Sequence, residues 1–198
     1  MIGKQHLAAA IERFRMTEGA PDVRIRWHSR LLLPGLPSDG TPYEAFYLRR
    51  LGSTAAVAAR RAQVEHAGRA AGIAFRFDRI EMLPNTIAAH RLAMHPELTD
   101  AQRETLIARI FAAHFVDGLF ISDMPTLARL AASVGLDAQR MHDYLVSDAG
   151  RDTLLHAQAT PAYRAVTGVP GLVLNGSVLL SGAQPPDVLL NAMAKAVA

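Results

Sequence analysis

Cysteine is absent from the 198 residues of this sequence. The absence excludes disulfide cross-links and thiolate metal sites. It also excludes dithiol exchange by this chain alone, because the attacking group in that reaction is a thiolate. The histidines do not replace a thiolate site, since His90 with His95, and His114 with Asp117, lack the i, i+4 spacing of a helix-borne zinc motif. We therefore predict no bound metal.

Long apolar runs and blocks of like charge are absent as well. No stretch approaches the roughly 20 apolar residues that cross a bilayer, and the first residues lack the pattern of a secretion signal. The formal charge is only +3, and the arginines are scattered among acidic residues. These absences predict a cytoplasmic protein that binds neither membranes nor nucleic acids. Half of the residues are apolar, as in one globular domain with a sizeable insertion.

The N-terminal region contains two periodic segments. From Lys4 to Phe14, apolar residues recur at three- and four-residue spacing, which predicts an amphipathic helix. A turn is predicted from Gly19 to Asp22. Val23 to Trp27 then alternates apolar residues with arginine, which predicts a strand near a sheet edge with one face buried.

The middle of the sequence is predicted to be mainly helical. A loop rich in proline and glycine, Leu33 to Pro42, precedes this region. Ser53 is predicted to cap a helix after a break at Gly52. Phe75 to Pro84 is a mixed, partly extended segment. Helices are expected over residues 43–71 with that break, 85–94, 99–116, 124–134, 137–146 and 150–166.

The C-terminal region changes character again. Gly171 to Leu174 and Ser177 to Leu180 are short runs separated by Asn175-Gly176, which predicts a β-hairpin. Pro185-Pro186-Asp187 is typical of a helix start, and this last helix should reach Val197. The order helix, strand, helical block, hairpin and helix indicates an α/β fold.

Several motifs in this order resemble the DsbA family, and especially its cytoplasmic FrnE-like branch. The resemblance implies a thioredoxin-like fold with a large helical insertion, divided into residues 1–40, 41–166 and 167–198. It also implies thiol–disulfide oxidoreductase or isomerase activity. The motifs are LPNTIAAHRL at 83–92, FAAHFVDGLFISDMPTLARLAASVGLD at 111–137, YLVSDAG at 144–150, TGVPGLVLNG at 167–176 and SGAQPPDVLLNAM at 181–193.

The resemblance also implies that this sequence lacks the first strand and the redox motif of that fold. In the family, a strand and Cys-Pro-Trp-Cys precede residues similar to Ile2-Gly3-Lys4, and Met1 stands at the second cysteine. The missing strand would lie between Val23 to Trp27 and Gly171 to Leu174. Three explanations stay open: a start upstream of Met1, a strand from a partner or a domain swap, or a re-paired sheet with another role.

The candidate binding residues follow from the same resemblance. A cis bond is expected at Val169-Pro170, where the backbone of Val169 would hydrogen-bond an extended thiol substrate. Asn85, Thr86 and Arg91 resemble a segment near the cleft of kappa-class glutathione transferases and 2-hydroxychromene-2-carboxylate isomerases. Asn85 or Thr86 equally suits a helix cap.

Three functions fit these observations. The first is a DsbA-type oxidoreductase or isomerase that is inactive in dithiol chemistry in this cysteine-free form. The second is an isomerase of a small aromatic or polyketide-like molecule, with His28 or His90 as the general acid–base and glutathione as the cofactor to consider. The third is a non-catalytic protein that holds extended peptides or forms a homodimer through an open sheet edge.

Overall fold

The computed structural model describes residues 1–160, 168–176 and 178–197. Four short strands pair as two antiparallel ladders: β1 (Thr41–Pro42) with β2 (Met82–Leu83), and β3 (Gly171–Leu174) with β4 (Val178–Ser181). A 3-10 turn, η1 (Phe77–Arg79), precedes β2. Within the described ranges the helices are α1 (Ile2–Arg15), α2 (Tyr43–Leu51), α3 (Thr54–Ala70), α4 (Ile87–Ala93), α5 (Asp100–Phe115), α6 (Met124–Ala132), α7 (Ala138–Val146), α8 (Arg151–Ala159) and α10 (Pro186–Val197).

Most of the predicted helices are confirmed. Ser53 caps α3 as predicted, because its hydroxyl oxygen accepts from the Ala56 N–H at 3.1 Å. The helix predicted over 150–166 is α8 as far as Ala159, and residues 161–166 of that prediction lie outside the described ranges. The predicted boundary between residues 166 and 167 lies outside them too.

The strand predicted at Val23–Trp27 is wrong. Residues 20–31 belong to no helix or strand, although the apolar side chains between 23 and 27 are partly buried and the two arginines among them are exposed. A strand requires a neighbour whose backbone groups it can bond, and none of the strands in the described ranges pairs with this segment. The alternation of apolar residues with arginine therefore correctly indicates which side chains are buried. It cannot indicate whether a neighbouring strand is present.

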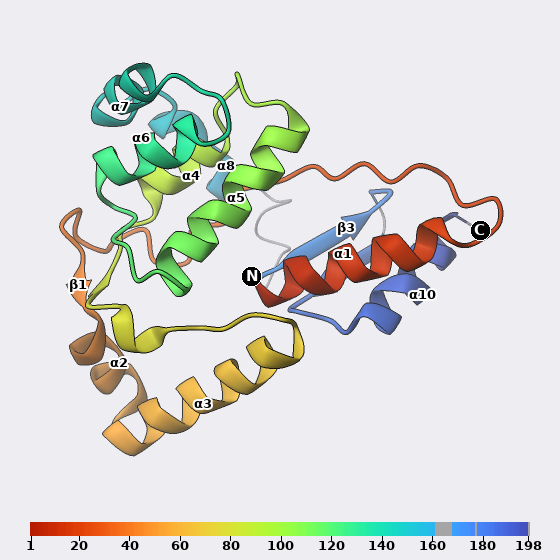
Figure 1. Cartoon of the computed structure of the whole chain (residues 1–198), viewed down its shortest axis with the longest axis horizontal. Coiled ribbons are helices and arrows are strands. Elements are labelled where there is room, and N and C mark those ends of the chain that lie inside the picture. Colours follow the sequence, from red (N-terminus) through yellow and green to blue (C-terminus); the bar gives the residue numbers. More distant parts are fainter. Residues whose placement is uncertain (161–167, 177, 198) are drawn as a thin grey trace.

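The helices α1 and α10 pack with the β3–β4 hairpin as one unit (Figure 1). The turn of this hairpin contains Asn175 and Gly176 at φ values of 46° and 76°, the left-handed conformations that an Asn-Gly hairpin turn requires. Ser177, predicted to begin the second strand, lies outside the described residues. The buried core of the unit is Leu7, Ala10, Ile11, Phe14, Leu189 and Met193, and Val23, Ile25, Leu172, Leu174 and Leu180 pack against it.

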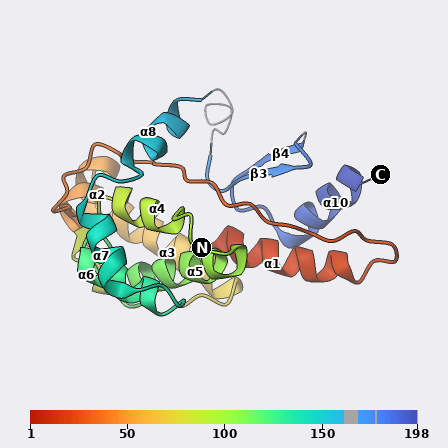
Figure 2. The same cartoon turned by 90° about the horizontal axis from the view of Figure 1, so that it is seen from above.

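A larger core lies within the helical region, mainly among α4, α5, α6 and α7 (Figure 2). A capping box begins α5, in which Thr99 and Gln102 each satisfy the other's backbone N–H. The helical region contacts the first unit, and the extended segment that follows α1, at several places, among them the two that follow. Lys4 Nζ lies 3.0 Å from Glu104 Oε1, and a small cluster of Leu31, Ile87 and Leu154 connects the extended segment with α4 and α8. No helix in the described part of the chain is long and apolar enough to cross a membrane.

Candidate functional site

The cis bond predicted at Val169-Pro170 is confirmed. It precedes β3 directly and lies against the first turn of α1, because a Cβ atom on Gly3 would come within 2.5 Å of Pro170 Cγ. The Pro170 carbonyl accepts from the Gly182 N–H at 2.8 Å, which fixes the loop to the far end of β4. The hairpin and α1 therefore hold the proline loop from two sides.

Val169 lies at the surface of this loop. The residue is 44% exposed, and the hydrogen bonds formed by the described residues include none from the Val169 N–H or carbonyl. Backbone groups of this kind are the ones that an extended ligand uses in strand addition. The loop thus offers one donor and one acceptor next to the start of α1.

His90 and Ser29 form a contact that joins α4 to the extended segment. His90 Nδ1 lies 3.1 Å from Ser29 Oγ, and Ser29 is buried. Burial lowers the pKa of His90 from 6.5 to about 4. A general base works best when its pKa lies near the working pH, so His90 is a weak base in this position. Sequence reasoning missed Ser29, because nothing in the sequence connects it with a residue so far along the chain.

His28, the other predicted acid–base residue, is exposed and immediately precedes Ser29. The Gln158 side chain of α8 bonds the backbone beyond it, donating to the Ser29 carbonyl at 2.9 Å and accepting from the Leu31 N–H at 3.0 Å. The Gln158 amide thus bonds one backbone carbonyl and one backbone N–H of the extended segment, as the backbone of a neighbouring strand would. His28 therefore sits where the segment first becomes anchored to the helical region.

Asn85 and Thr86 lie at the start of α4, and the bonds of Asn85 are structural ones. Its Oδ1 accepts from the Ile87 N–H at 3.0 Å, and its Nδ2 donates to the Leu36 carbonyl at 2.6 Å. Thr86 is the N-cap residue but makes no side-chain cap bond. The capping alternative thus accounts for Asn85, which also anchors the loop before β1.

Arg91 is only 5% exposed, and its guanidinium is occupied by backbone carbonyls. It donates to Tyr144 at 2.7 Å, Leu145 at 3.0 Å, Ser147 at 2.7 Å and Ala149 at 2.8 Å. These carbonyls lie at and just after the end of α7, where a helix leaves acceptors unsatisfied. Arg91 therefore holds α4 to α7, and this role explains its burial without a substrate.

The comparisons with known proteins agree with this arrangement. A family model described as "DSBA-like thioredoxin domain" matches residues 1–194. The chain belongs to the DSBA-like thioredoxin family. The crystal structure of a probable DsbA oxidoreductase from Streptomyces coelicolor resembles this DSBA-like domain with a TM-score of 0.86 and 28% identity, over 99% of this chain and 83% of that chain. No curated protein matches the sequence.

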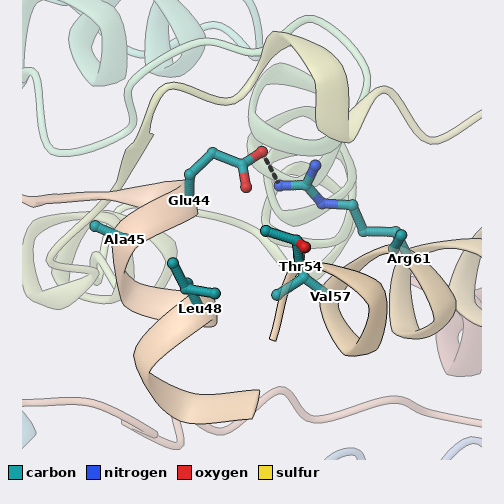
Figure 3. Close-up of a pocket in the computed structure, with 7 residues that line it drawn as sticks. Glu44, Ala45, Leu48, Thr54, Val57 and Arg61 are labelled. Carbon is teal, nitrogen blue, oxygen red and sulfur yellow. Dashed lines mark hydrogen bonds and ion pairs between the residues drawn. The ribbon is translucent and has the colours of Figure 1, made fainter. Parts of the chain in front are cut away.

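One pocket of the DSBA-like domain lies between α2 and α3, away from the proline loop. Its volume is about 230 Å³, and its walls are mainly aliphatic. Figure 3 shows Leu48 of α2 facing Val57 of α3, with Glu44 and Arg61 paired at 2.6 Å above them. This ion pair is satisfied internally, so we do not place the functional site here. Across the described residues, no group of three or more histidine or acidic side chains is arranged to bind a metal.

Proposed function

We propose that this DSBA-like domain binds extended, thiol-bearing polypeptides at the Val169-Pro170 loop. The observation that carries the proposal is the exposed residue Val169, whose backbone N–H and carbonyl form no hydrogen bond with the described residues and which precedes a cis proline beside the first turn of α1. A peptide that aligns with Val169 gains two backbone hydrogen bonds without displacing existing ones. The apolar exposed side chain of Val169 suits an apolar neighbour on the ligand.

The chemistry served by this binding is thiol–disulfide exchange, with every thiol supplied by the bound molecules. Exchange proceeds by attack of a thiolate on a disulfide sulfur, and these 198 residues contain no cysteine. The domain therefore contributes binding and orientation, and residues 1–198 alone form no mixed disulfide. Glutathione is the smallest thiol peptide of this class, and we include it among the ligands to test.

The geometry gives less support to a histidine-dependent isomerase. His90 is the better placed of the two candidate histidines, but its pKa of about 4 makes it a poor proton acceptor near neutrality. Its Nδ1 is also engaged with Ser29. Because Arg91 is occupied by four carbonyls, it offers a substrate carboxylate little. We therefore put thiol-peptide binding first.

The test compares two substitutions at one residue. Val169→Pro removes the backbone N–H, whereas Val169→Ala keeps the N–H and shortens the side chain. We expect a fluorescent cysteine-containing peptide to bind the unchanged protein and the alanine variant within about threefold of each other. We expect the proline variant to bind at least about tenfold more weakly, because a net hydrogen bond is worth about 1 kcal/mol and the ring also obstructs the ligand.

Circular dichroism shows whether the proline variant keeps its helices, and titration with glutathione tests the smallest ligand. Equal binding by both variants, or binding that follows the side chain instead of the N–H, would contradict the proposal. An insulin-reduction assay with dithiothreitol provides a second readout. Any acceleration by residues 1–198 has to come from binding and orientation, because the chain contains no cysteine, so we expect Val169→Pro to abolish it and Val169→Ala to keep it.

A further inference from the structure

Arg61 of α3 has a buried hydrogen-bond donor that the described part of the chain leaves unbonded. Its Nη2 donates to Glu44 Oε1 at 2.6 Å, but its Nε is buried and has no acceptor among the described residues. Buried polar groups are nearly always bonded in folded proteins, and an unbonded donor of a charged group is destabilising. The Glu44–Arg61 ion pair is thus complete in charge but incomplete in hydrogen bonds.

The unbonded Nε and the bonded Nη2 lie on the same edge of the Arg61 guanidinium. The two oxygens of one carboxylate can accept from both donors of such an edge. Arg76 shows this arrangement in the same protein, since its Nε and Nη2 donate to the two oxygens of Asp78 at 3.0 and 2.7 Å. Glu44 uses only half of the corresponding edge of Arg61, so this edge can accept a carboxylate that fits it better.

The Arg61 guanidinium is held in place more firmly than its present partner. Its Cζ lies 4.9 Å from the centre of the ring of Tyr43, which is a buried residue. Stacking on an aromatic ring orients the planar fork of an arginine. The Glu44 side chain, in contrast, is 72% exposed, and exposed ion pairs contribute little to stability. A carboxylate from a ligand can therefore displace Glu44 from Arg61.

The pocket between α2 and α3 supplies an apolar surface next to this edge. Its walls include Arg61 and the aliphatic side chains Ala45, Leu48, Val57 and Ala58 (Figure 3). Its volume is about 230 Å³. Since a cavity of about 150 Å³ holds one benzene molecule, an aliphatic chain of about six carbons fits this space.

We propose that the pocket between α2 and α3 binds a short-chain aliphatic monocarboxylate. Its two oxygens accept from Nε and Nη2 of Arg61 in place of Glu44, and its alkyl chain packs against the aliphatic walls. The ligand would add apolar contacts to a thinly packed helix, because only Val57 and Gly68 of the 17 residues of α3 are buried. The site is separate from the proline loop, and the inference does not rest on peptide binding at Val169.

The probe is hexanoate, titrated into the isotopically labelled full chain at constant ionic strength while the amide chemical shifts are recorded. We expect saturable shifts in α2 and α3 with a Kd below about 1 mM. Acetate has the carboxylate without the tail, and hexanol has the tail without the carboxylate. Each should bind at least about tenfold more weakly than hexanoate. Absence of saturation, or binding of acetate or hexanol as tight as that of hexanoate, would overturn the proposal.

The length of the ligand tests the size of the pocket. From butanoate to hexanoate the affinity should rise about tenfold, because each buried methylene contributes about threefold to fourfold. Beyond the length that fills the pocket the gain should stop, so decanoate should bind no more than about threefold more tightly than octanoate. A steady rise through decanoate would show unspecific adsorption to apolar surface and would contradict the assignment.

Two matched pairs of variants locate the site. Arg61→Gln should weaken hexanoate binding at least about tenfold. Arg60→Gln removes the same charge from the neighbouring exposed arginine of α3 and should leave the binding unchanged. Ala58→Leu fills the pocket and should abolish the dependence on chain length, whereas Ala59→Leu changes an exposed alanine that does not line the pocket. Equal effects within either pair would overturn the assignment.

A further variant tests the displacement of Glu44. Glu44→Gln removes the competing carboxylate, so hexanoate should bind about threefold more tightly, and Glu12→Gln makes the same change of charge on α1 as the control. Unchanged or weaker binding by Glu44→Gln would contradict the displacement. Circular dichroism shows whether Arg61→Gln keeps its helices, and if it does not, Ala58→Leu decides the location. Val169→Pro should keep hexanoate binding, so failure at the proline loop and failure at this pocket can be told apart.

Discussion

At the scale of single residues, His90 is a histidine that folding keeps neutral. Its pKa is about 4 in the folded protein because of burial, against 6.5 in the unfolded chain. The unfolded chain therefore takes up this proton first as the pH falls, and stability is lost between pH 6.5 and 4. At about 1.4 kcal/mol per pKa unit, the loss from this residue is up to about 3 kcal/mol at pH 4.

We expect His90→Gln to lose less stability than the unchanged protein between pH 7 and pH 4, by about 1–3 kcal/mol. Urea unfolding at pH 7, 5.5 and 4 measures the difference. Some loss should remain, because burial also lowers the pKa of His95 and His114. The exposed His66→Gln is the control and should follow the unchanged protein. The assignment fails if His90→Gln and His66→Gln give the same pH dependence.

At the scale of elements, Arg91 connects one helix with the end of another. Its guanidinium donates hydrogen bonds to four backbone carbonyls at distances of 2.7–3.0 Å. The guanidinium carbon, Cζ, lies 5.0 Å from the centre of the Tyr144 ring. A lysine ammonium cannot reproduce this planar set of donors. We expect Arg91→Lys to lower the free energy of unfolding by about 2–4 kcal/mol, because several buried carbonyls lose their donors.

Chemical unfolding at neutral pH measures this effect. The matched control is Arg109→Lys, which changes an exposed arginine on α5 and should alter stability by less than about 0.5 kcal/mol. Similar stability of the two variants would mean that Arg91 does not hold α4 to α7. It would then reopen the possibility that Arg91 serves a ligand.

Local signals predicted the elements far better than they predicted contacts. The break before α3, the Asn175-Gly176 turn and the helices follow from short-range residue patterns. The cis bond before Pro170 followed from family resemblance and not from periodicity. The strand at Val23–Trp27 failed, and Ser29 and the role of Arg91 escaped prediction, because each depends on a partner distant in the sequence.

At the scale of the whole molecule, the two largest buried clusters of the described residues share no residue. One belongs to α1, α10 and the hairpin, and the larger one belongs to the helical region. We expect Phe14→Ala to cost about 3–5 kcal/mol through a cavity in the smaller core. Hydrogen exchange should accelerate in α1 and α10 while amides of α5 and α6 keep their protection, because the cores open separately.

Leu127→Ala in the larger core provides the reciprocal control and should accelerate exchange in α4, α6 and α7 while α10 is spared. Equal acceleration of both regions by either substitution would show one cooperative unit. In that case the link through Leu31, Ile87 and Leu154 is stronger than its small size indicates.

The contact between Gly3 and Pro170 ties together two positions at opposite ends of the chain. Glycine is a poor helix residue, disfavoured by about 1 kcal/mol relative to alanine, yet a Cβ at position 3 would collide with the proline ring. Descendants of this sequence can therefore exchange Gly3 for a better helix former only after the proline has been replaced or displaced. The order in which these two codons change is constrained, and the glycine is inherited together with the loop that it touches.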